Sequence, residues 1–303
     1  MRYFSYILAT LTLIASPAFA EFSGQFRRAN AFYLAEDYAD ALALLNPLAE
    51  TGDADAQTLL GFMYERGLGL GVDNQAALMW YLRGIEGGSS MAASNLGVVF
   101  RDGLLEQSVD AQRSAGYFRA AIDMGDISSY ADLALLYGTG ALGAPNQDEA
   151  LRLFQTGIDL GDMRVKLQLA YARRHGDAVP QDYAIARQLL TELAADGNGE
   201  ALGNLAVMME LGEGAPVDLD EAAATYEAAM HLGYVEAAYW AAWMYADNPD
   251  HFADPVRGEA YCLWAMGHGS QGQVQEWEPK CADWFGDHST AQHKAARHLA
   301  ATL

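Results

Sequence analysis

The apolar and polar positions of the chain follow a helical spacing, and this pattern starts again at regular intervals. It is clearest in residues 56–88, AQTLLGFMYERGLGLGVDNQAALMWYLRGIEGG, which predict two short amphipathic helices separated by a glycine-rich turn. A glycine closes each copy, at Gly52, Gly88, Gly125, Gly161, Gly197, Gly233 and Gly269. The steps between these glycines are 36 or 37 residues, and so constant a period indicates a repeat architecture.

Alignment of the copies places small side chains at one position on each predicted helix. On the first helix they are Gly61, Gly97, Ala134, Ala170, Ala206 and Ala242. On the second helix they are Ala41, Ala77, Ser114, Ala150, Ala186, Ala222 and Gly258. Side chains this small allow two helices to approach closely, so we predict tight helical hairpins. Two further positions carry mainly large apolar groups, such as Tyr64 with Phe100 and Tyr81 with Phe118, and are predicted as core.

The predicted turns also repeat. The first helix of each hairpin is expected to end at Gly67, Gly103, Gly140, Gly176, Gly212 and Asn248, residues that tolerate the left-handed conformation. The second helix is expected to begin at a capping side chain, which is Asp37, Asp73, Asp110, Asn146, Asp182, Asp218 or Asp254. Seven caps on one period predict the helix boundaries along most of the chain.

The two ends differ from the regular array. Residues 21–52 are predicted to form an N-terminal helical hairpin, in which Pro47 should kink or break the second helix. Beyond Gly269 the period stops, and residues 270–303 are predicted to contain two capping helices, 273–285 and 289–303. An open stack of repeats needs such an end cap, and Trp277 and Trp284 are expected to cover the last repeat.

The repeated pattern Ala-x-x-x-Leu-Gly-x-x-Tyr-x-x-Gly, followed by a glycine-rich turn and Ala-x-x-Trp-Tyr, resembles the Sel1-like repeat, a relative of the tetratricopeptide repeat. In the clearest copy the matching residues are Ala56, Leu60, Gly61, Tyr64, Gly67, Ala77, Trp80, Tyr81 and Gly88. The resemblance implies an all-α fold, a right-handed α-solenoid of about six such hairpins over residues 53–269. Arg173 and Met209 depart from the aromatic position and indicate diverged copies of the same fold.

The first twenty residues predict a secretory signal peptide. They contain one charge at Arg2, an apolar run over residues 6–14, and Ala18-Phe19-Ala20 before the expected cleavage point. The alternative, a membrane anchor, is disfavoured because the apolar run is short for a bilayer. No cysteine lies near the cleavage point, which disfavours a lipoprotein. We therefore expect a periplasmic or secreted protein.

Acidic residues outnumber basic ones, 40 to 18, and give the chain a formal net charge of −22. Removal of Arg2 with the signal peptide would lower this by one, to −23. Such a surface repels nucleic acid and anionic membranes and favours cationic partners or divalent ions. The two cysteines, Cys262 and Cys281, are expected to form a disulfide, because nearby cysteines of exported proteins usually pair.

No catalytic signature was found, and we predict neither an enzyme nor a cofactor. The stretch from Gly67 to Gly71 resembles a nucleotide-binding loop, but it follows a helix and is interpreted as the turn of a hairpin. His288, His293 and His298 are spaced by five residues, so they cannot share one face of a helix. They are expected to face solvent, and no metal site is predicted.

Two outward positions on the first helices are the candidate binding residues. One carries a leucine in the first copy, polar groups in the next four copies and a tryptophan in the last, and the other is apolar in every copy. By resemblance to tetratricopeptide stacks they would form the floor of a concave groove for an extended or helical peptide. The alternative is that the apolar row packs between repeats. The predicted ligand-binding residues are Phe62, Asn95, Val98, Asp132, Leu135, Gln168, Tyr171, Asn204, Val207, Trp240 and Trp243.

The expected function is that of a non-enzymatic exported scaffold or adaptor with a protein or peptide partner. The resemblance implies that such proteins restrain envelope sensor kinases, scaffold exopolysaccharide export or engage host proteins. A second hypothesis is a β-lactam-binding or β-lactam-hydrolysing enzyme, but the cysteine-rich relatives of that type carry a cysteine pair in each repeat. A third is a cation-dependent, cell-wall-associated scaffold that uses the acidic surface.

Overall fold

The computed structural model describes residues 24–252 and 254–303, so the predicted signal peptide lies outside the described residues. The described residues form sixteen helices and contain no strand. The chain divides into two compact units, and the division lies between Asp126 and Ile127. The all-α fold predicted from the periodicity is confirmed.

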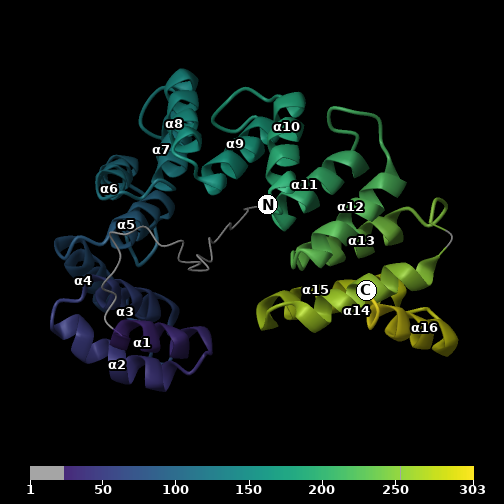
Figure 1. Ribbon diagram of the computed structural model, residues 1–303, viewed down its shortest axis with the longest axis horizontal. Helices are drawn as coiled ribbons and strands as arrows, with labels where there is room; N and C mark the ends of the chain where they lie inside the picture. Colours follow the sequence, from purple (N-terminus) through teal and green to yellow (C-terminus); the bar gives the residue numbers. More distant parts are fainter. Residues whose placement is uncertain (1–23, 253) are drawn as a thin grey trace. The chain divides into compact units, whose positions relative to one another are not determined.

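Unit 1 consists of three helical hairpins (Figure 1). Within each hairpin the two helices contact each other, and the second helix of each of the first two hairpins also contacts the first helix of the next one. The helices are α1 (Gly24–Leu34), α2 (Tyr38–Glu50), α3 (Ala54–Arg66), α4 (Asn74–Glu86), α5 (Ser90–Asp102) and α6 (Ala111–Asp123).

Unit 2 continues the same plan with four hairpins and two further helices at the C-terminus (Figure 1). The hairpin helices are α7 (Ser129–Gly138), α8 (Gln147–Asp159), α9 (Met163–His175), α10 (Tyr183–Ala195), α11 (Gly199–Glu210), α12 (Leu219–His231), α13 (Glu236–Asp247) and α14 (Pro255–His268). The last two helices are α15 (Gln271–Phe285) and α16 (Thr290–Ala300). Among the helices described, none is long and apolar enough to cross a membrane.

The predicted helix starts are confirmed at all seven capping residues. Each side chain accepts a hydrogen bond from a backbone N–H of the first turn, as Asp73 does from Ala76 at 2.9 Å. Such a bond satisfies one of the amides that a helix start leaves free. Several first helices end as predicted, with Gly67, Gly103 and Gly176 in the left-handed conformation. These local interactions explain why the hairpins begin and end at one period.

The small residues lie where the two helices of a hairpin approach each other most closely. A Cβ on Gly97 would lie 2.5 Å from Cε1 of Phe118, and a Cβ on Gly61 would lie 2.8 Å from Cδ1 of Tyr81. Ser114, from the other small-residue position, donates a hydrogen bond of 2.7 Å to the carbonyl of Gly97. The tight hairpins predicted from these positions are therefore present, with a ring packed over each glycine.

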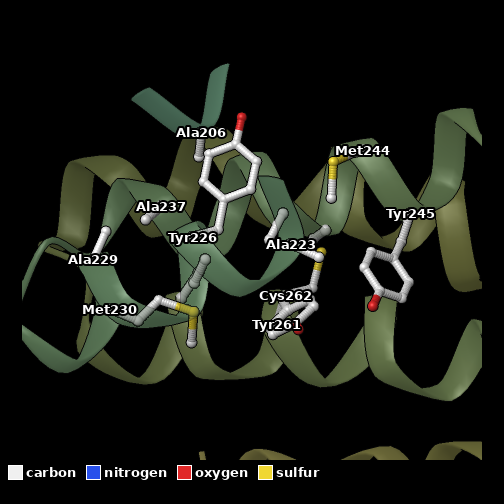
Figure 2. Packing of buried hydrophobic residues seen from close by; sticks show 14 of the residues in the cluster. Ala206, Ala223, Tyr226, Ala229, Met230, Ala237, Met244, Tyr245, Tyr261 and Cys262 are labelled. Carbon is white, nitrogen blue, oxygen red and sulfur yellow. The ribbon is translucent and has the colours of Figure 1, made fainter. Parts of the chain in front are cut away.

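The core of unit 2 at its C-terminal end packs alanines around tyrosine rings (Figure 2). Tyr226 is fully buried among alanines of its own and neighbouring helices, including Ala206 and Ala237. Tyr261 is equally buried, and its ring contacts that of Tyr245 edge to face. Alanine is small enough for the backbones to approach, so a few large rings can fill the remaining space.

Two helices cap the last hairpin at the C-terminus. Both α15 and α16 pack against α14, and a disulfide joins Cys262 of α14 to Cys281 of α15 with a Cα separation of 6.0 Å. Trp277 is 4% exposed and stacks on Tyr239 of the last hairpin, with 5.0 Å between the ring centroids. The disulfide closes a loop with a sequence separation of 19 residues, which stabilises the cap by about 3 kcal/mol in the chain-entropy view.

Two expectations are corrected by the structure. Of the kink or break expected at Pro47, the break does not occur: α2 continues to Glu50, because the proline lies near the end of the helix where few further hydrogen bonds depend on it. His288 and His293 do not face solvent, since their imidazoles converge on Glu259. The helical-face argument did not apply to His288, which lies in the turn between α15 and α16 and not on a helix.

Candidate functional site

The apolar row predicted to face outward is mostly half-buried. In unit 1, Phe62 and Val98 are both half-buried, and the rings of Phe62 and Tyr33 contact edge to face with 6.4 Å between their centroids. In unit 2, Leu135, Tyr171 and Val207 are half-buried as well. Each of these side chains thus keeps only part of its surface for a partner.

Trp243 differs from the rest of the row. Its side chain lies on α13 and is 40% exposed, which is unusual for so large an apolar group. Trp240, one turn earlier on the same helix, is half-buried and contacts Tyr234 edge to face at 5.6 Å. Trp243 is therefore the member of the predicted set with most indole surface available for binding.

The predicted polar row divides into accessible and buried members. Asn95, Asp132 and Gln168 are half-buried. Asn204 on α11 is only 3% exposed, contrary to the expectation that its amide lines an open groove floor. The reason is that the neighbouring repeat supplies hydrogen-bond partners that enclose this side chain.

Asn204 lies at the centre of a polar network that joins α9 to α11. Its side-chain amide donates to the Tyr171 hydroxyl and to the backbone carbonyl of Glu200, each at 2.8 Å. The same tyrosine hydroxyl donates to the Glu200 carboxylate at 2.7 Å. Burial, together with the nearby Glu200 charge, raises the pKa of Tyr171 far above its usual value, so its hydroxyl keeps its proton as a donor.

Arg174 extends this network with a buried ion pair. Its side chain is 9% exposed, and Nε lies 2.5 Å from the Glu213 carboxylate in the turn after α11. The same guanidinium approaches the Asn204 side-chain oxygen at 3.5 Å. Burial of a lone guanidinium or carboxylate costs free energy because the charge loses its hydration. Each of these two charges therefore stabilises the other in this position.

Glu210 is a second buried carboxylate beside the network. It is 8% exposed and accepts a 2.7 Å hydrogen bond from the Tyr226 hydroxyl on α12. Burial raises the pKa of Glu210 to about 7, and the Asp247 charge acts in the same direction. The Tyr226 hydrogen bond and the Arg174 charge oppose this shift without cancelling it. Near neutral pH this carboxyl is partly protonated.

Substitution of Glu210 by glutamine should therefore stabilise the protein at pH 8. The folded pKa exceeds the unfolded one, so stability is full below about pH 4.5 and falls as the pH rises toward 7. Glutamine removes this penalty and keeps an oxygen for Tyr226, so we expect a gain of about 1–2 kcal/mol at pH 8, limited by partial solvation.

The gain should shrink toward zero near pH 5, and urea unfolding at the two pH values measures it. The exposed Glu278→Gln, also in unit 2, serves as a control and should change stability little at either pH. An equal effect of Glu210→Gln at both pH values would contradict the assignment of a raised pKa.

These buried polar residues were missed in the sequence, although a signal for them exists. The position of Glu65 recurs as Arg101, Gly138, Arg174 and Glu210 in successive copies. The copies with a glutamate at this position also have a tyrosine sixteen residues later, and in both the hydroxyl donates to the carboxylate. The pairs are Tyr81 with Glu65 at 2.8 Å and Tyr226 with Glu210 at 2.7 Å. Comparison of the two positions together would have predicted these pairs.

A separate hollow of about 560 Å³ lies among α8, α9 and α10. Its lining includes Arg152, Lys166, Arg173 and Glu192, but none of the predicted binding residues. Two of these cations are engaged: Arg152 pairs with Glu149, and Lys166 pairs with Glu192 at 2.5 Å. The hollow therefore offers no free cationic group from these two residues.

The stacked hairpins define the class of the protein, an all-α repeat scaffold. The Sel1 repeat family model matches residues 54–89, 90–126, 127–162, 166–198 and 199–234, more than half of the chain. The chain thus belongs to the Sel1 repeat family. The boundary between units 1 and 2 falls between the second and third matched repeats. The sixth predicted copy is not among the matched segments, although α13 and α14 pair there as a hairpin.

Two solved structures support the fold. A Sel1 repeat protein from Oxalobacter formigenes is 24% identical, with a TM-score of 0.56 over 80% of this chain and 96% of that one. A protective antigen present in uropathogenic Escherichia coli strains, which displays an SLR fold, is 22% identical with a TM-score of 0.50. That match covers 90% of this chain and 58% of the antigen, so this chain spans just over half of the antigen's length. At these identities the similarity concerns the fold.

Sel1 repeat solenoids are generally non-enzymatic scaffolds, and their fold is typical of protein–protein interaction. The candidate site in unit 2 is in keeping with this class. It combines a buried polar network on α9 and α11 with an exposed indole on α13, and α11 contacts α13 directly.

Proposed function

We propose that the protein is a non-enzymatic exported scaffold that binds a cationic protein or peptide segment through the first helices of unit 2. The observation that carries this proposal is Trp243, which is 40% exposed on α13, a helix with an acidic residue at each end. Tryptophan is enriched among the residues that dominate binding energies, because it buries a large rigid surface.

The charge of the partner follows from the acidic groups around this helix. Glu236 and Asp247 lie at the two ends of α13, and Asp247 is exposed. The whole chain carries a net charge of −22. A lysine- or arginine-rich segment would therefore be attracted to this region, and its binding should weaken as the salt concentration rises.

Export, and with it a role in the envelope, is proposed from the signal-peptide pattern of the first twenty residues. The disulfide between Cys262 and Cys281 supports this location, because such bonds persist in oxidising compartments. Restraint of a sensor kinase, assembly of exopolysaccharide and engagement of a host protein are the three roles that this proposal includes.

The test is affinity capture from an envelope extract with the mature protein and its Trp243→Ala variant, followed by quantitative mass spectrometry. Trp243 is 40% exposed and is not one of the buried members of the core, so the variant should fold. A partner that uses this face should bind at least about thirtyfold more weakly to the variant, in line with a major contact residue.

Leu232→Ala is the matched control. Leu232 is 49% exposed and follows α12, the second helix of its hairpin, so it tests exposed apolar surface away from the first helices. The control should retain the partner. Capture of the same partners by all three proteins, or partners that are indifferent to salt, would refute the proposed binding face.

A further inference from the structure

Two histidines and a glutamate meet at the C-terminal cap. Glu259 lies on α14, His288 in the turn between α15 and α16, and His293 in the first turns of α16. Nδ1 of His288 lies 2.7 Å from one carboxylate oxygen of Glu259, and Nδ1 of His293 lies 2.7 Å from the other. The three potential ligand atoms all lie within 4.8 Å of one another.

The cluster is shielded from solvent. The side chains of Glu259 and His288 are 10% and 12% exposed, and that of His293 is 32% exposed. A carboxylate in such a position is rarely left without charged or hydrogen-bonded partners. All of its partners in this cluster are imidazoles, whose nitrogen atoms are also good ligands for transition metals.

We propose that Glu259, His288 and His293 bind a divalent transition metal ion, with Zn²⁺ as the first candidate. Two imidazoles and one carboxylate are a ligand set that Zn²⁺ accepts, and three protein ligands leave a fourth position for water or a group from a partner. Imidazole ligands favour Zn²⁺, Co²⁺ or Ni²⁺ over Ca²⁺ and Mg²⁺, which prefer oxygen atoms.

The geometry requires only a small adjustment. Ligand bonds of about 2.0–2.2 Å in a tetrahedral site place neighbouring ligand atoms roughly 3.3 Å apart. The two imidazole nitrogens each lie 2.7 Å from a different oxygen of Glu259, and the ligand atoms lie within 4.8 Å of one another. Individual separations would therefore change by about 0.6 Å and by at most about 1.5 Å to reach the spacing of a metal site. The partly exposed His293 ring has room to move by this amount.

Metal binding would link α16 to α14, a connection that the disulfide does not provide. The Cys262–Cys281 bond ties α15 to α14, whereas the cluster ties α16 and its preceding turn to the same helix. Glu259 lies one helical turn before Cys262 on α14, so both links hold the cap at nearly the same place. The metal site is independent of the binding face around Trp243.

The experiment uses the mature protein without an affinity tag, after treatment with a chelator. Titration with Co²⁺ should give visible absorption bands that saturate at one equivalent and disappear when Zn²⁺ is added. Zn²⁺ should also slow hydrogen exchange in α16, and Ca²⁺ at the same concentration should not.

His293→Ala and Glu259→Gln should each weaken Co²⁺ binding at least about tenfold. Glutamine at position 259 keeps an oxygen for the imidazoles, so this variant separates loss of the metal from loss of the fold. His298→Ala, an exposed histidine on the same helix, is the control and should bind as the parent does. No saturable absorption, or unchanged binding by Glu259→Gln and His293→Ala, would overturn the proposal.

Discussion

Replacement of Gly138 by alanine is expected to destabilise unit 2 by about 3 kcal/mol, although it adds a single methyl group. Gly138 is the last residue of α7, and a Cβ there would lie 2.1 Å from the carbonyl oxygen of Ala178 and 2.5 Å from its Cα. These are backbone atoms of the turn between α9 and α10 in the next hairpin, so the contact cannot be relieved by a change of rotamer.

The turn itself has little freedom to move away. Ala178 adopts a left-handed conformation with a φ of 65°, and Ala178 and Val179 are 5% and 0% exposed. A shift of this turn would disturb buried groups and a backbone already in a costly conformation. The added methyl group should therefore force the two hairpins apart.

Chemical unfolding followed by tryptophan fluorescence measures this effect, because five of the six tryptophans belong to unit 2. Gly267→Ala is the matched control, since Gly267 is a helical glycine of the same unit and a Cβ added there would meet no atom within 4 Å. It should be neutral or stabilising by up to about 1 kcal/mol. Equal stability of the two variants would show that α7 and the turn are not in contact.

The sequence predicted the boundaries of the hairpins because these depend on local chemistry. A capping carboxylate or amide acts on amides two or three residues away, so Asp182 and its counterparts carry their information within a few positions. The small residues were equally informative, because Gly61 and Gly97 recur with the period and each faces a ring of its own hairpin. Interactions within one repeat are therefore visible in the sequence.

Interactions between repeats were much harder to predict. Gly138 occupies a position that is charged in four other copies, so nothing local indicates that a neighbouring turn passes over it. Asn204 was expected on an open groove floor, but Tyr171 and Arg174 of the preceding hairpin enclose it. In both cases the decisive partner lies about 30 to 40 residues away, beyond the reach of helix periodicity.

The histidines of the cap illustrate the same limit. Their spacing was interpreted on one continuous helix, whereas His288 precedes the start of α16. Glu259 lies 29 residues before His288 and is one of 40 acidic residues, so the sequence alone could not single it out. Only the packing of α16 against α14 brings these three residues together.

Replacement of Arg174 by methionine is the second change expected to have a large effect, a loss of about 3 kcal/mol or more. Methionine keeps most of the apolar stem but leaves the Glu213 carboxylate, which is 18% exposed, without its cation. It also removes a donor from the side-chain oxygen of the buried Asn204. Loss of one partner of a buried ion pair leaves the other charge buried and uncompensated. The resulting loss of folding free energy is larger than the net stabilisation that the intact pair provides.

Arg152→Met is a close control, because Arg152 also approaches a glutamate, Glu149, at 2.5 Å in unit 2. Its side chain is 71% exposed, so water replaces the lost partner and the change should alter stability little. In the double variant Arg174→Met with Glu213→Leu, the carboxylate that paired with Arg174 is also removed, and we expect recovery of at least about 1 kcal/mol relative to Arg174→Met alone. Urea unfolding of the four proteins gives these differences. Similar losses for Arg174→Met and Arg152→Met would mean that burial does not strengthen the Arg174 pair.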